Sequence, residues 1–169
     1  DMSDTSVPSD VAEKILRFAK ASVAVGWMKN KAYVNLGGVA MGIAGSYCNA
    51  DMFQKYFGIR AEWVDMTEIV RRITLEIYDH DEYDKALAWV KENCKEGFDL
   101  NEGKELPEII TKSKVVPADK DWEFVTKMTM VMRDILYGNE KLDEMGWHEE
   151  ALGKNAVAGG FQGQRNWTD

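Results

Sequence analysis

Cysteine and histidine are scarce in this chain of 169 residues, which has only two of each. Cys48 and Cys94 lie outside any Cys-x-x-Cys pair, so they do not form a disulfide framework. We expect two reduced, buried thiols, as in a cytoplasmic protein. His80 and His148 are far apart in sequence and lack the paired spacing of metal-binding histidines. Neither has a neighbouring serine or cysteine that would indicate a nucleophile.

Basic charge and long apolar runs are also lacking. Lys and Arg number 21 against 29 Asp and Glu, which gives a net charge of −8 and excludes the basic surface of a nucleic-acid-binding domain. The longest apolar run, 19–28, is shorter than the roughly 20 residues of a membrane span and is interrupted by Lys20. The first ten residues are polar and acidic, unlike a signal peptide. We therefore predict no membrane or nucleic-acid partner and a cytoplasmic location. A start at Asp1 instead of Met suggests a piece of a longer protein.

What the chain does have is enough apolar content, 45%, for one domain with a core. Strands are predicted at 32–36, 60–65 and 156–160, of which the last is made of small residues, and helical patterns lie between them. This alternation predicts an α/β fold, a three-layer sandwich with a mostly parallel, Rossmann-like sheet and helices on both faces. We expect a single domain over 1–169, with a surface insertion at 98–121 that is rich in charged residues and glycine.

Several helices are expected from apolar periodicity and from capping residues. Ser9 is the predicted N-cap of the first helix, whose stripe of Val11, Ile15 and Phe18 should face a core. Thr67 is the predicted cap of a helix that carries Ile69, Ile73 and Ile77. The remaining helices are expected over 52–57, 81–93, 121–137 and 140–152. The acidic run 79–84 fits a helix N-terminus better than a metal cluster.

Three polar or glycine-rich segments follow the predicted strands, namely 37–46, 65–67 and 159–169. Ligands of parallel α/β sheets bind where the carboxyl ends of the strands meet, so these segments should converge at one edge. The first has three interpretations. It resembles a dinucleotide fingerprint whose first glycine is missing, with Asp65 as the ribose-binding acid. It also suits a sugar- or polyol-facing loop, or a plain turn from strand to helix.

The terminal segment is the strongest functional signal. It combines glycines with Gln162, Gln164, Arg165 and Trp167, which is the composition of a wall around a polar ligand. The alternative is a loop held together by its own amides. Met41, among the glycines of the first segment, is either an apolar contact in a pocket or a flexible core filler.

These residues carry a resemblance to a known family. The stretches 34–46, 64–68, 86–89 and 158–169 resemble L-fucose isomerase in order and approximate spacing. The resemblance covers nearly the whole chain and weakens over 98–121, where this sequence carries extra residues. Asn166 departs from the family pattern, which has His there. The resemblance implies an aldose–ketose isomerase acting on L-fucose or D-arabinose through an enediol, with Mn²⁺ and a hexameric assembly.

The resemblance also implies which residues belong to the site. Met41 and Gln162 match substrate-binding residues of the family, and Gln164 and Trp167 are further candidates. The family's metal ligands fall beyond the position of Asp169, so no catalytic or metal-binding residue is expected in this segment. The segment alone should then be inactive. It should also expose apolar surface near Met41, Phe161 and Trp167, and self-associate there. The alternative is a non-catalytic sugar-binding or dinucleotide-binding module.

Overall fold

The computed structural model describes residues 6–38, 47, 49–95 and 121–161. Its centre is a parallel sheet in the order β2-β1-β3, formed by β1 (Ala32–Leu36), β2 (Arg60–Val64) and β3 (Ala156–Phe161). The predicted strands are confirmed to within a residue at either end. The α/β fold with a parallel sheet is confirmed as well.

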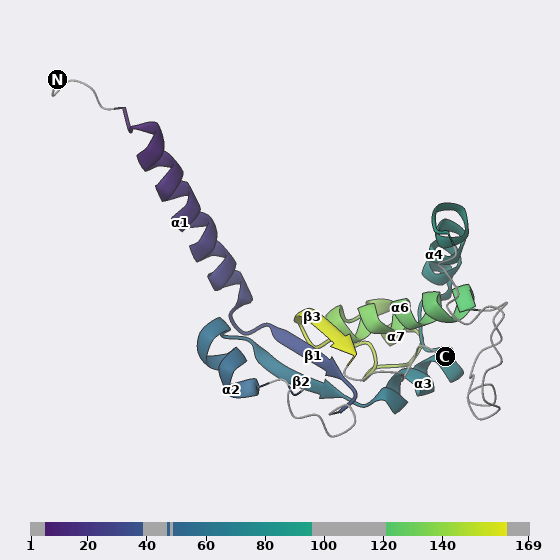
Figure 1. Ribbon diagram of the computed structural model, residues 1–169. Helices are drawn as coiled ribbons and strands as arrows, with labels where there is room; N and C mark the ends of the chain where they lie inside the picture. The colour runs from purple at the N-terminus through teal and green to yellow at the C-terminus, as the bar shows by residue number, and fades with distance from the viewer. Residues whose placement is uncertain (1–5, 39–46, 48, 96–120, 162–169) are drawn as a thin grey trace, which may run out of the picture.

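Helices lie on both faces of this sheet (Figure 1). One face carries α3 (Met66–Thr74) and α6 (Asp121–Tyr137), with α4 (His80–Asn93) packed against α6. On the other face, α2 (Ala50–Met52) continues into the π-helix η3 (Phe53–Phe57), and the Phe53 ring lies 5.2 Å from that of Tyr33. The short helix α7 (Glu140–Glu144) precedes β3.

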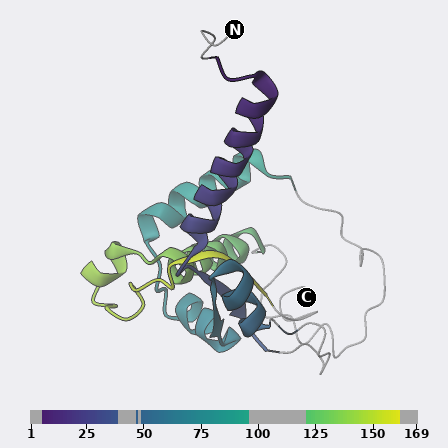
Figure 2. The same ribbon diagram turned by 90° about the vertical axis from the view of Figure 1, so that its left-hand side faces the viewer.

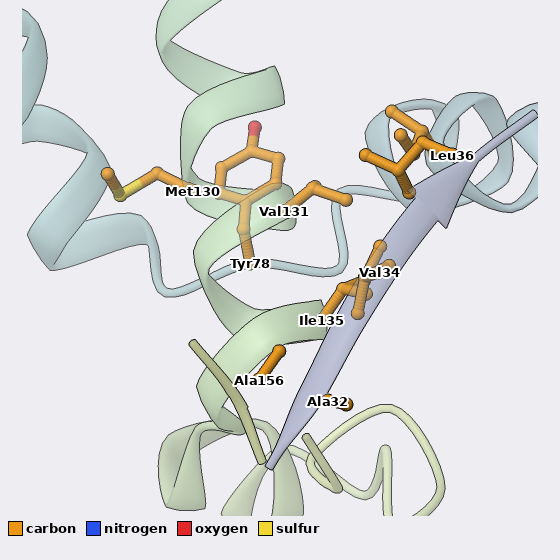
Figure 3. Close-up of a cluster of buried hydrophobic side chains, with 9 residues drawn as sticks. Ala32, Val34, Leu36, Tyr78, Met130, Val131, Ile135 and Ala156 are labelled. Atoms are coloured by element: carbon orange, nitrogen blue, oxygen red, sulfur yellow. The ribbon is translucent and has the colours of Figure 1, made fainter. Parts of the chain in front are cut away.

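The core lies between β1 and the helices α3 and α6. Val34 and Leu36 project from β1 toward Val131 and Ile135 of α6, as Figure 3 shows. The buried cluster also contains Ile69, Tyr78, Met130, Ala32 and Ala156. The neighbouring Met128 and Met132 are half-buried against it, so the methionines of α6 are packing residues as their helical position suggests.

Glycines end the helices where the chain reverses. Gly58 follows η3 with a φ of 67°, and Gly138 follows α6 with a φ of 83°. Such positive φ angles are strained for residues with a Cβ, which explains why both helices stop where the sequence predicts. The predicted helix 140–152 is wrong beyond Glu144, because Gly146 adopts a φ of 89° and the chain continues in turns.

The first helix, α1 (Ser9–Met28), differs from expectation in two ways. Pro8 occupies the N-cap position and no side chain caps the helix, so the prediction for Ser9 is wrong. No residue of α1 is buried, so its apolar stripe faces no core within the described residues. Periodicity showed that one face of the helix is apolar, but it could not show where the covering surface lies.

Three further expectations concern the two cysteines, the insertion at 98–121 and a membrane span. Cys94 is exposed just after α4, so the expectation of a buried thiol is wrong there. Cys48 lies outside the described residues, as does the predicted insertion 98–121 except for Asp121, where α6 begins. No described helix is long and apolar enough to cross a membrane.

Candidate functional site

The carboxyl ends of all three strands meet at one edge of the sheet. Leu36, the last residue of β1, is in register with Val64 of β2 on one side and with Phe161 of β3 on the other. The segments predicted to carry the site therefore leave the sheet from three adjacent positions. Sequence reasoning expected this convergence, and the parallel register explains it.

The predicted site residues themselves lie outside the described residues. Met41 belongs to the segment that follows β1, and Gln162 comes directly after Phe161, the last residue of β3. Gln164 and Trp167 follow in the same terminal segment. The structure thus places the strand ends from which these segments depart, and the assignment of the four side chains stays a prediction.

The first turn of the glycine segment is described as far as Gly38. Gly37 has a φ of 92°, and its N–H donates to the Val64 carbonyl at 2.9 Å. Gly37 thus extends the pairing with β2 while it turns the chain, which is a backbone role. Gly38 is exposed, and a Cβ built on it would meet none of the described residues within 4 Å.

Asp65 performs a local structural task at the end of β2. Its carboxylate accepts hydrogen bonds from the Thr67 N–H at 2.8 Å and from the Thr67 hydroxyl at 2.7 Å. These bonds lower the pKa of Asp65 and make it the N-cap of α3. The prediction that Thr67 caps this helix is wrong, because Thr67 is the donor to the cap. The dinucleotide interpretation loses support, since the acid that it needs for ribose is already engaged.

The two glycines of β3 have different surroundings. A Cβ on Gly159 would lie 3.0 Å from Leu136 Cδ2 and 3.0 Å from the Val34 carbonyl oxygen, so this glycine allows β3 to pack closely on β1 and α6. A Cβ on Gly160 would have as its nearest neighbour the Tyr33 hydroxyl, at 3.5 Å. Gly159 is therefore a packing residue, although its sequence context pointed to ligand approach.

An exposed aromatic pair near this edge was missed by sequence reasoning. Tyr47 stacks on Trp63 of β2 with ring centroids 6.0 Å apart and an angle of 22° between the ring planes. Both rings are exposed, and Trp63 is in register with Asn35, one residue before the end of β1. The available signal was the position of Trp63, which alternates with inward-facing residues of β2, but nothing local pairs it with Tyr47.

Charged side chains of α3 form a cluster of ion pairs that reaches the segment after α7. Glu68 of α3 accepts from Arg71 at 2.8 Å and from Arg72 at 2.8 Å, and the bond from Arg71 is the main reason that the pKa of Glu68 falls to about 2. Arg71 also pairs with Glu150. This cluster fixes α3 to the segment after α7. Because each carboxylate has an arginine partner, the cluster is a structural network.

The histidines and acidic residues make no metal centre in the part of the chain that is described. His80 Nε2 lies 3.1 Å from the Glu76 carbonyl oxygen, and the His148 ring contacts Asp143. The acidic run at 79–84 is a helix N-terminus as predicted, with the Asp79 carboxylate accepting from the Glu82 N–H at 3.1 Å. The described residues contain no group of three or more His, Cys, Asp or Glu side chains arranged for a metal ion.

The family match and the most similar relatives that we compared agree with one another. The family described as "L-fucose isomerase, second N-terminal domain" matches residues 31–169. The chain is 62% identical over 169 residues to L-fucose isomerase of Clostridium perfringens. It is 56% identical over 171 residues to that of Bacteroides fragilis, and 53% identical over 169 residues to that of Vibrio vulnificus. Each comparison covers 100% of this chain but only 28% of the relative.

Proposed function

This chain belongs to the L-fucose isomerase family, and from that premise we propose that it is the second amino-terminal domain of an aldose–ketose isomerase. The proposed reaction converts L-fucose to L-fuculose, and D-arabinose to D-ribulose, through an enediol. The proposed complete enzyme is cytoplasmic, depends on Mn²⁺ and assembles as a hexamer. This chain spans 28% of the length of its relatives, so the activity is proposed for the longer polypeptide.

One observation supports the proposed role of this domain. The matched region includes both segments that hold Met41 and Gln162, and those segments depart from the paired ends of β1 and β3. Strand ends at one edge of a parallel sheet are where such folds bind small ligands. We propose that this edge of the sheet forms part of the wall of the sugar site.

The two matched residues suit different parts of an open-chain sugar. The Gln162 amide both donates and accepts hydrogen bonds, which fits a pair of neighbouring hydroxyls. The Met41 side chain supplies an apolar contact for the carbon chain. Gln164 and Trp167 are assigned as further wall residues, and the domain holds the sugar in place for the reaction.

The described residues do not fit a Mn²⁺ site. Mn²⁺ prefers oxygen donors such as carboxylates, and the described Asp, Glu, His and Cys side chains form no group of three or more that could hold it. Asp65, a carboxylate at the site edge, is engaged in capping α3. We therefore assign the metal ligands and the proton-transferring groups to the parts of the family's polypeptide outside this chain, and derive no catalytic step within it.

The test is a chimera in which this chain replaces the aligned segment of the Clostridium perfringens L-fucose isomerase. We expect the chimera to form L-fuculose from L-fucose with Mn²⁺, to lose activity on chelation, and to regain it when Mn²⁺ is restored. A folded chimera that isomerises neither L-fucose nor D-arabinose would overturn the proposed function.

A further inference from the structure

Helix α1 is the most unusual element of the molecule. It is 20 residues long, and none of its residues is buried. Figure 1 shows it extending away from the sheet and its covering helices, and in Figure 2 its amino-terminal part again rises clear of them. Its large apolar side chains are nevertheless numerous and exposed, including Phe18 at 76% and Val23 at 72%. The others are Val11, Ile15, Leu16, Val25 and Trp27.

Such a helix needs a covering surface. Most helical stability in proteins comes from packing of an apolar face against other elements, and α1 has no buried residue. Monomeric proteins rarely leave a continuous apolar surface of this kind open. The packing that stabilises α1 must therefore come from outside the described residues.

The distribution of charge along α1 indicates the shape of that surface. All charged residues lie in its first part, where Asp10 pairs with Lys14 and Glu13 with Arg17 on one side of the helix. The last part, 21–28, has no charged residue, and its apolar side chains point in all directions around the axis. A helix that is apolar all round is a buried helix.

We infer that α1 is a buried helix of the neighbouring domain on the amino side, inserted into an apolar groove of the longer isomerase polypeptide. The family match begins at residue 31, just after α1 ends at Met28. The family domain is described as the second amino-terminal one, and the relatives are much longer than this chain. The position of α1 before the match and the description of the matched domain as the second one place the missing apolar surface on the amino side, and the greater length of the relatives provides the chain to form it.

A second copy of this chain would cover α1 less completely than a groove does. Two α1 helices packed side by side would cover one stripe of each helix. The exposed side chains of Phe18 and Val23 lie about 140° apart around the helix axis at 100° per residue, so one stripe cannot cover both. A groove surrounds the last part of the helix and leaves the charged side of its first part in water.

The experiment compares hydrogen exchange of α1 in the 169-residue chain and in the chimera with the Clostridium perfringens enzyme. We expect the α1 amides to exchange at least about tenfold more slowly in the chimera, because packing suppresses local opening. The peptide that contains β1 is the internal reference and should be protected in both. This readout is independent of sugar conversion, so its outcome is separate from that of the proposed function.

Matched substitutions sharpen the test. Val23→Glu should leave the melting temperature of the 169-residue chain unchanged, where the side chain is exposed, but lower that of the chimera by several degrees. Lys14→Ala, on the charged side, should change neither. Equal exchange of α1 in both proteins would overturn the inference. Concentration-dependent protection of α1 in the 169-residue chain, with a dimer in light scattering, would assign the surface to a second copy instead.

Discussion

Arg72 donates a hydrogen bond of 2.8 Å from its Nε to the Glu68 carboxylate, while its own side chain is only 8% exposed. The same guanidinium reaches the Glu150 carbonyl oxygen at 3.1 Å. This nearly buried arginine thus joins α3 to a segment far away in sequence. Its charge is balanced inside the fold by Glu68, and that dependence can be measured.

Replacement of Glu68 should destabilise the domain. Glu68→Ala leaves the Arg72 charge buried without its carboxylate, so we expect the free energy of unfolding to fall by about 2–3 kcal/mol in urea titrations. The matched control is Glu13→Ala, which removes an exposed ion pair with Arg17 and should cost less than about 0.5 kcal/mol. Equal losses for the two variants would show that Glu68 has no special role.

The same carboxylate should make the fold sensitive to acid. The pKa of Glu68 falls from its ordinary value near 4.5 to about 2 in the folded chain. The stabilisation is therefore complete above about pH 4.5 and is lost as the pH falls toward about 2. We expect the difference in melting temperature between the wild type and Glu68→Gln to shrink across this range. A difference that stays constant with pH would contradict the prediction.

The glycine pair of β3 offers a matched test of packing. Gly159→Ala should lower the free energy of unfolding by about 1–3 kcal/mol, because the new methyl group is crowded by Val34 and Leu136. Among the described residues, the methyl group of Gly160→Ala meets the Tyr33 hydroxyl at an ordinary contact distance, so this variant should change the free energy of unfolding by less than about 0.5 kcal/mol. Chemical denaturation of both variants gives the comparison, and the reverse order would refute the packing role.

The proposed sugar contact of Gln162 can be separated from that of Gln164. In the active chimera with saturating Mn²⁺, Gln162→Ala should lower kcat/KM for L-fucose by roughly 5- to 150-fold, equivalent to about 1–3 kcal/mol. Gln164→Ala should have the smaller effect. If only Gln164→Ala impairs the enzyme, the wrong amide is assigned. If neither does, the terminal segment is structural.

The isolated chain should bind no Mn²⁺ tightly and isomerise no sugar, because the resemblance to L-fucose isomerase places the metal ligands of the family beyond the position of Asp169. Calorimetric titration of the 169-residue chain with Mn²⁺ is the direct measurement, with the chimera as the positive control. Micromolar binding by the isolated chain, or L-fuculose formed by it, would show that the chain carries chemistry not assigned to it.

The sequence by itself determined the strands and most helix ends. Each strand is a short segment followed by glycine or a polar residue, and short segments bounded by such residues are typical of strands. The αL glycines, Gly58 and Gly138, ended their helices where predicted, because positive φ is a local property of the backbone. The meeting of the three strand ends at one edge also followed, since the long helical connections between the strands are typical of parallel pairing.

Only the tertiary structure decided which groups meet. Nothing in the local sequence brings Glu150 to Arg71, stacks Tyr47 on Trp63, or gives Gly159 its close contact with Val34. The cap of α3 was also misassigned, because Asp65 and Thr67 are both good capping residues and only the folded turn selects one. For α1, periodicity revealed an apolar face but not its partner. A pattern records which side of an element avoids water, and only packing decides what covers that side.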